Sequence, residues 1–147
     1  MKKINTQSPA KINLYLRILG KRNDGYHDIA TSFQLINLFD EMSFEVTKNE
    51  ISVNSNQDFL NGEDNTIYKA AKRLKELFNI KTGIKININK NIPIGAGLGG
   101  GSSNAASTMV ALNRLWDINL DKENLIDIAK DVGADVPLFI FGKNSIG

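Results

Sequence analysis

The sequence contains no cysteine and only one histidine among its 147 residues. Disulfide bonds and cysteine-ligated zinc sites are therefore excluded, and a lone His27 without cysteine partners argues against a metal site at that residue. An absence of cysteine fits a reducing compartment, so we expect a cytoplasmic protein.

Long apolar runs and a strong charge bias are also missing. No segment approaches the length of a membrane span. No apolar region follows the basic residues Lys2 and Lys3, so we expect neither a signal peptide nor a membrane partner. The net charge is +2 with the signs interleaved, and such a chain is not expected to bind nucleic acid. Its length predicts one domain with a substantial core.

What the chain does have is a glycine-rich stretch, with five of its twelve glycines at positions 95–101. Residues 83–89 before it alternate as a strand does, and residues 104–116 after it show a helical pattern. A glycine loop between strand and helix binds phosphate, because glycines allow close approach and a helix N-terminus offers unpaired N–H groups. Of Ser102 and Ser103, one is expected to cap the helix and the other to face phosphate or its metal ion.

The short pattern alone has other interpretations. Residues 95–100 match G-x-G-x-x-G, which also fits a dinucleotide site, whereas no Gly-Lys-Ser/Thr follows to make a Walker A loop. A dinucleotide fold places its loop after the first strand, with an acidic residue about 20 positions on at the end of the second strand. Here the loop comes late, and the residue at that distance is Asp117, in a turn between helices. A simple tight turn would not need so many glycines.

The rest of the chain alternates between strand and helix patterns. Strands are expected at residues 11–19, 28–38, 42–46 and 51–53. A helix begins at Asn65, a possible cap, and another has Asp121 as its cap and ends at Gly133. Pro137 forces the residue before it into an extended conformation, so Asp135 is expected at a corner between this helix and a strand at 139–141.

Four short segments carry a family resemblance. They are S-P-A-K-I-N-L at 8–14, D-G-Y-H at 24–27, the glycine-rich stretch, and G-A-D-V-P at 133–137. Together they resemble the GHMP kinase superfamily of small-molecule kinases. The D-G-Y-H segment is similar to the branch that phosphorylates a cytidyl-diphosphate-linked methylerythritol in the non-mevalonate route to isoprenoids. The similarity runs from Ser8 to the last residue.

The resemblance implies an α+β fold like ribosomal protein S5 domain 2, in two layers, with a mostly antiparallel sheet and helices on one face. It makes residues 1–147 the N-terminal, ATP-binding domain of a kinase whose C-terminal domain lies outside this sequence. It also implies transfer of the γ-phosphoryl group of ATP, with Mg2+, to the 2-hydroxyl of the small-molecule substrate. We expect a monomer or a homodimer.

Residue roles follow from the same resemblance. Asp135 matches the catalytic aspartate and Lys11 its partner, although the pattern alone would place Lys11 and Asn13 on a solvated strand face. The other implied roles are substrate contacts for Asn13, Tyr26 and His27, positions near the adenosine for Asn65 and Lys90, a metal contact for Ser103, and an ATP phosphate loop of Pro93, Ile94, Gly95, Ala96, Gly97, Leu98, Gly99, Gly100, Gly101, Ser102 and Ser103.

Three alternatives stay open at this point. The chain could be another GHMP kinase of the mevalonate or homoserine type. It could be a dinucleotide-binding oxidoreductase, through the glycine pattern alone. It could also be a non-enzymatic RNA-binding domain of the same fold, although the near-neutral charge and the presence of both Lys11 and Asp135 argue against this.

Overall fold

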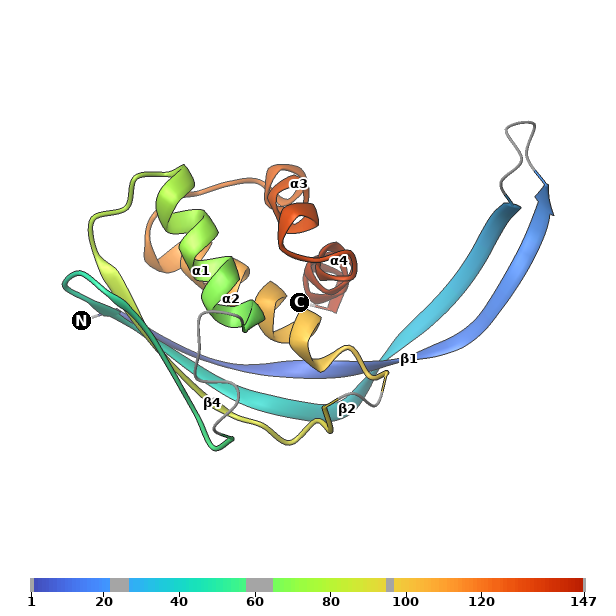
Figure 1. Ribbon diagram of the computed structural model, residues 1–147, viewed down its shortest axis with the longest axis horizontal. Helices are drawn as coiled ribbons and strands as arrows, with labels where there is room; N and C mark the ends of the chain where they lie inside the picture. The colour runs from blue at the N-terminus through green and yellow to red at the C-terminus, as the bar shows by residue number, and fades with distance from the viewer. Residues whose placement is uncertain (1, 22–26, 58–64, 95–96, 147) are drawn as a thin grey trace.

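The computed structural model describes residues 2–21, 27–57, 65–94 and 97–146, of which the side chains of 14–21, 27–32 and 142–146 lie outside the description. A four-stranded sheet carries a layer of helices on one face (Figure 1). The elements in chain order are β1 (Lys3–Lys21), β2 (His27–Thr47), β3 (Ile51–Ser55), α1 (Thr66–Leu77), β4 (Gly83–Asn89), α2 (Gly100–Leu115), α3 (Lys122–Val132) and α4 (Val136–Ile146). The predicted two-layer α+β fold is confirmed.

The sheet has the strand order β1-β2-β4-β3. β2 pairs antiparallel with both β1 and β4, whereas β3 runs parallel to β4. α1 connects the two parallel strands and lies on the covered face (Figure 1). A dinucleotide-binding fold needs a mostly parallel sheet with helices on both faces, so this topology does not support the oxidoreductase alternative.

β1 and β2 form a long ribbon that extends past the helical layer as a two-stranded arm (Figure 1). The strands expected separately at 28–38 and 42–46 are one continuous strand, and His27 begins it instead of lying in the preceding loop. The pairing register shifts between Pro9 and Lys11 and again between Asn13 and Tyr15. Such irregularities bend a strand and re-aim its side chains, which matters for Lys11 below.

The core lies between the sheet and the helices. In β4 the side chains alternate between buried and exposed, as the sequence predicted, so that one face of the strand packs under α1 and α2. Full burial of an aliphatic side chain contributes about 1.5–3 kcal/mol to stability. The large side chains of this core that are fully buried include Phe44, Ile67, Leu74, Ile84, Ile86, Met109, Leu112, Phe139 and Ile140.

The strand predicted at residues 139–141 is wrong, because this segment lies in α4. Val136, Phe139 and Ile140 are 1%, 0% and 0% exposed, and this spacing puts them on one face of a helix. Pro137 lies in the first turn, where a missing N–H breaks no helical hydrogen bond. Neither α4 nor another helix in the described part of the chain is long and apolar enough to cross a membrane.

Candidate active site

The glycine loop connects β4 to α2. Gly95 and Ala96 lie outside the described residues, and Pro93 and Ile94 before them are exposed. α2 begins at Gly100, earlier than the pattern from residue 104 predicted, and its N-cap is Gly99. The expectation that a serine caps this helix is wrong. Gly99 has a φ of 73°, a left-handed conformation that glycine adopts more readily than any other residue. Because glycine has no side chain, this N-cap position offers no capping group.

The N-terminus of α2 differs from those of its neighbours. The side chains of Asn65 and Asp121 accept hydrogen bonds of 2.9 Å from main-chain N–H groups at the starts of α1 and α3, which confirms both predicted caps. No side chain caps α2. The N–H groups of Gly100, Gly101 and Ser102 have no intrahelical acceptor at this position. They therefore form a set of donors suited to an anion, at the positive end of a helix dipole.

Lys11 of β1 lies directly beside this loop. Its main-chain N–H donates to the carbonyl of Leu98 at 2.9 Å. A Cβ atom placed on Gly99 would come 3.2 Å from Cγ of Lys11, which shows how closely the lysine packs on the loop. Lys11 is only 7% exposed, contrary to the solvated position that alternation alone predicted, whereas Asn13 is exposed. No ion pair joins a described side chain to the Lys11 ammonium group, so the lysine brings a positive charge to the loop that no carboxylate offsets there.

Asp135 immediately precedes α4 and is exposed. The helix that follows contacts the loop, because a Cβ on Gly99 would lie 2.7 Å from Cζ of Phe139. The structure thus brings Lys11, Gly99 and the first turns of α4 into one region. No ion pair joins Asp135 to Lys11 within the described residues.

Lys90 points into the protein. It is 5% exposed, and its ammonium group lies 2.5 Å from Oδ2 of Asp40 and 3.0 Å from Oδ1 of Asn104. The expected position of Lys90 near an adenosine stays a prediction. Its ammonium group is already bonded to Asp40 and Asn104. Asp40 and Asn104 had no role in the sequence-based prediction. No local pattern links Asp40 to a lysine 50 positions away, since only the fold brings them together.

The surroundings of Ser103 limit how it could contact a metal ion. Ser103 is fully buried, and its hydroxyl group shares a 2.8 Å hydrogen bond with that of Ser8. The described residues contain no cluster of three or more acidic or histidine side chains. Mg2+ bound with a nucleotide takes most of its ligands from phosphates and water, so the site is compatible with this ion without a protein cage.

Two of the predicted substrate residues are described in part or not at all. Tyr26 lies outside the described residues, and only the main chain of His27 is described, at the start of β2 on the long arm. Their predicted contacts with the substrate therefore stay predictions, as does that of Asn13.

Comparison with known proteins agrees with this geometry. The family model for the N-terminal domain of GHMP kinases matches residues 65–143. The chain is 50% identical over 143 residues to a 4-diphosphocytidyl-2-C-methyl-D-erythritol kinase of Francisella philomiragia, covering 96% of this chain and 52% of the relative. It is 48% identical over 139 residues to the enzyme of the same name from Methylococcus capsulatus, covering 94% and 48%. The chain thus spans about half the length of the curated relatives it matches.

Solved structures show the same fold. A crystal structure of a 4-(cytidine 5'-diphospho)-2C-methyl-D-erythritol kinase aligns with a TM-score of 0.75 and 37% identity, covering 95% of this chain and 49% of the other. A mevalonate kinase from Methanococcus jannaschii aligns with a TM-score of 0.69 and 20% identity, covering 95% and 51%. The second likeness concerns the fold alone.

Proposed function

Because this chain belongs to the GHMP kinase family, we propose that it binds ATP with Mg2+ at its glycine loop and supplies the phosphoryl-transfer site of a small-molecule kinase. The observation that carries the proposal is the uncapped N-terminus of α2 together with the largely buried Lys11, which packs on the loop before this helix. The N–H groups of Gly100, Gly101 and Ser102 suit phosphate oxygens, and the lysine supplies the positive charge that a triphosphate needs.

Phosphoryl transfer depends mainly on positioning and on stabilising negative charge, because its transition state is loose. A bond forms between the substrate hydroxyl oxygen and the γ-phosphorus, and the bond from this phosphorus to the β,γ-bridging oxygen breaks, releasing ADP. Lys11 stabilises the charge on the phosphoryl oxygens. The carboxylate of Asp135 accepts the hydroxyl proton late in the step, as the new bond to phosphorus forms.

When Mg2+ is bound, it offsets charge on the β- and γ-phosphates. Phosphate oxygens and water would hold most of its coordination sphere. Ser103 remains our candidate for a protein ligand. Its hydroxyl group would bind the ion either after its hydrogen bond to Ser8 broke, or while it still bonded to Ser8.

We infer that the acceptor is the 2-hydroxyl group of 4-diphosphocytidyl-2-C-methyl-D-erythritol. The names of relatives at 48–50% identity and the D-G-Y-H segment at 24–27 support this substrate over mevalonate or homoserine. Asn13, Tyr26 and His27 are then the substrate-binding residues, with Tyr26 and His27 at the cytidine end. The pathway is isoprenoid synthesis by the non-mevalonate route, with a small-molecule substrate in a cytoplasmic setting.

The test is a coupled assay of ADP release by the complete gene product that contains this chain. We expect turnover with the cytidyl substrate and none above background with mevalonate or homoserine. Thermal shift of the 147-residue chain with ATP and Mg2+, against NAD, separates nucleotide binding from catalysis. A shift with NAD alone, or release of ADP only with another alcohol, would contradict the proposal.

A further inference from the structure

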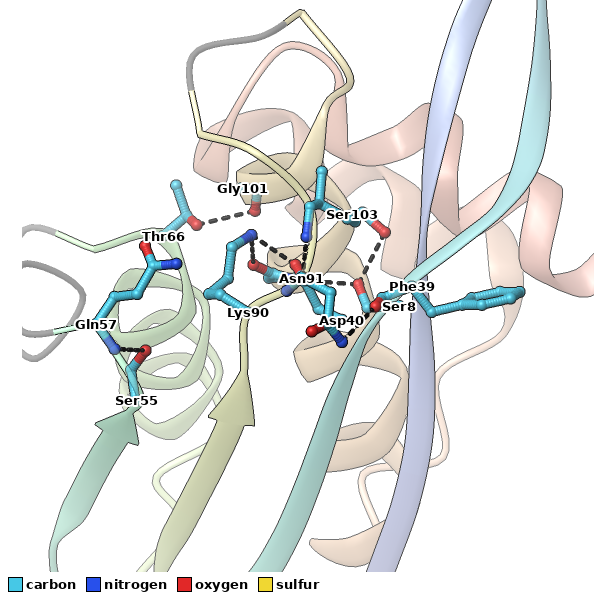
Figure 2. A network of polar contacts seen from close by, with 12 residues as sticks. Ser8, Phe39, Asp40, Ser55, Gln57, Thr66, Lys90, Asn91, Gly101 and Ser103 are labelled. Atoms are coloured by element: carbon cyan, nitrogen blue, oxygen red, sulfur yellow. Dashed lines mark hydrogen bonds and ion pairs between the residues drawn. The ribbon is translucent and has the colours of Figure 1, made fainter.

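A single buried carboxylate on β2 holds the chain on both sides of the glycine loop (Figure 2). Asp40 is 0% exposed. Its Oδ1 accepts the main-chain N–H groups of Asn91 at 2.6 Å and Ile92 at 2.8 Å. These are the last two residues before Pro93, where the loop begins. The carboxylate therefore positions the chain as it leaves β4.

The second oxygen of Asp40 binds the other side of the loop. Oδ2 accepts from Nζ of Lys90 at 2.5 Å and from Nδ2 of Asn104 at 3.0 Å. Lys90 also donates to Oδ1 of Asn104 at 3.0 Å, which closes a three-residue ring. Since Asn104 lies in the second turn of α2, one side chain connects the segment before the loop to the helix after it.

β1 adds a second set of bonds to the same helix. Nδ2 of Asn104 also donates to the hydroxyl of Ser8 at 3.0 Å, and this hydroxyl lies 2.8 Å from that of Ser103. Three residues further along β1, the main chain of Lys11 binds Leu98 inside the loop. We call Asp40, Lys90, Asn104, Ser8 and Ser103 the Asp40 cluster. Its members come from β1, β2, the residue that directly follows β4, and α2, and they meet beneath the loop.

The cluster reaches the predicted phosphate donors themselves. A Cβ on Gly100 would lie 3.0 Å from Nζ of Lys90, so the ammonium group packs directly against the first residue of α2. The Asp40–Lys90 pair is almost completely buried, with side-chain exposures of 0% and 2%. Well-packed apolar residues of similar volume often stabilise a fold as well as a buried ion pair does. Stability alone therefore does not explain why these polar groups lie under the loop.

We propose that Asp40, acting through Lys90 and Asn104, is a positioning residue that sets the spacing of the loop's N–H groups for the triphosphate of ATP. The proposal rests on the proposed function. It predicts that loss of the carboxylate weakens nucleotide binding specifically, and that this effect differs from a general loss of stability.

The first experiment compares Asp40→Asn with the complete gene product by calorimetric titration with Mg2+ and ATP, and by steady-state kinetics. We expect nucleotide affinity to fall by about tenfold or more, as for a lost charge-assisted contact. The KM of the cytidyl substrate should stay within about twofold, since its binding does not use these bonds. Asp131→Asn is the matched control, because Asp131 forms an exposed ion pair with Arg73 at 3.1 Å and should change neither constant.

The second experiment separates positioning from stability. D40N leaves the Lys90 ammonium buried without its counter-ion, so D40N/K90M is made alongside it. We expect the double variant to recover most of the lost melting temperature while its nucleotide affinity stays low. Recovery of both together would overturn the proposal. If D40N does not fold, Ser8→Ala removes two hydrogen bonds of the cluster without changing its charge. An affinity equal to that of the parent in both S8A and D40N/K90M would also overturn the proposal.

Amide hydrogen exchange without nucleotide tests the proposal independently of kinase activity. Two hydrogen-bonded N–H groups report on the loop, that of Lys11 on the Leu98 carbonyl and that of Ser103 on the Gly99 carbonyl, each at 2.9 Å. In D40N/K90M both should exchange about tenfold faster, while the N–H groups of α3 should not change. If the parent fails to bind ATP but this loop-specific change occurs, the proposed function fails and the positioning role stands. Unchanged exchange in the loop would refute the positioning role even where the parent binds ATP.

Discussion

The ring of Phe139 lies so close to Gly99 that a Cβ atom on the glycine would come within 2.7 Å of it. Gly97, two residues earlier, has nearly the same left-handed φ of 74° but no atom within 4 Å of such a Cβ. Substitutions at the two glycines therefore distinguish the cost of backbone strain from the cost of steric contact with α4. They also show that α4 and the loop share one packing surface.

The first prediction uses this pair. Gly97→Ala should destabilise the protein by about 1–2 kcal/mol, through the left-handed backbone alone. Gly99→Ala should cost about 1–3 kcal/mol more, because the added methyl overpacks against Phe139. Urea unfolding followed by circular dichroism measures both. Equal losses for the two variants would mean that the ring moves aside freely.

The second prediction concerns Lys11. Lys11→Met should leave the melting temperature unchanged or higher, because methionine has a similar volume and only apolar atoms at a position that is 7% exposed. Turnover of the complete gene product should fall by about 10²–10³-fold, as for a lost electrostatic contact in the transition state. Lys85→Met, at an exposed position on β4, is the control and should keep full activity. An active K11M variant would exclude the lysine from the mechanism.

The third prediction concerns Asp135. Asp135→Ala should reduce turnover by about 10²–10⁴-fold through loss of the proton acceptor, while ATP affinity survives. Because Asp135 is exposed, the free energy of unfolding should change by no more than about 0.5 kcal/mol. Kinetics and nucleotide titration of the same preparation check both statements. Near-normal turnover would remove this aspartate from the proposed chemistry.

The fourth prediction uses two variants of Asn65 to distinguish its role as a helix cap from a contact with the nucleotide. Asn65→Ala should destabilise the protein by about 1 kcal/mol, because its side chain caps α1, whereas Asn65→Ser keeps a capping oxygen and most of the stability. If Asn65 also contacts the adenosine, the KM for ATP should rise about three- to tenfold in both variants, the effect of one hydrogen bond. A serine variant with the parental KM would leave Asn65 a cap only.

The last prediction tests the acceptor specificity. His27→Ala should raise the KM of the cytidyl substrate more than it lowers kcat, because a residue at the cytidine end contributes to ground-state binding. The KM for ATP should stay within about twofold, which steady-state kinetics with each substrate varied in turn will show. A change confined to the ATP KM would contradict the placement of His27 at the cytidine.

Tertiary structure changed the sequence-based interpretation most at Lys11 and in α4. Alternation along β1 suggested a solvated Lys11, but the strand is irregular between Pro9 and Lys11, and the glycine loop packs over the lysine. In α4, the proline rule suggested a strand. The buried face of Val136, Phe139 and Ile140 instead favours a helix that accommodates Pro137 in its first turn.

The amino-acid sequence by itself determined the local features of this protein. Caps at Asn65 and Asp121, the alternation of β4 and the glycines before α2 all act over a few residues, so they can be recognised without knowing what packs against them. Only the tertiary structure decided which charges are buried together. Asp40 and Lys90 are 50 positions apart, and their pairing depends on how β2, β4 and α2 converge, which no short-range pattern encodes.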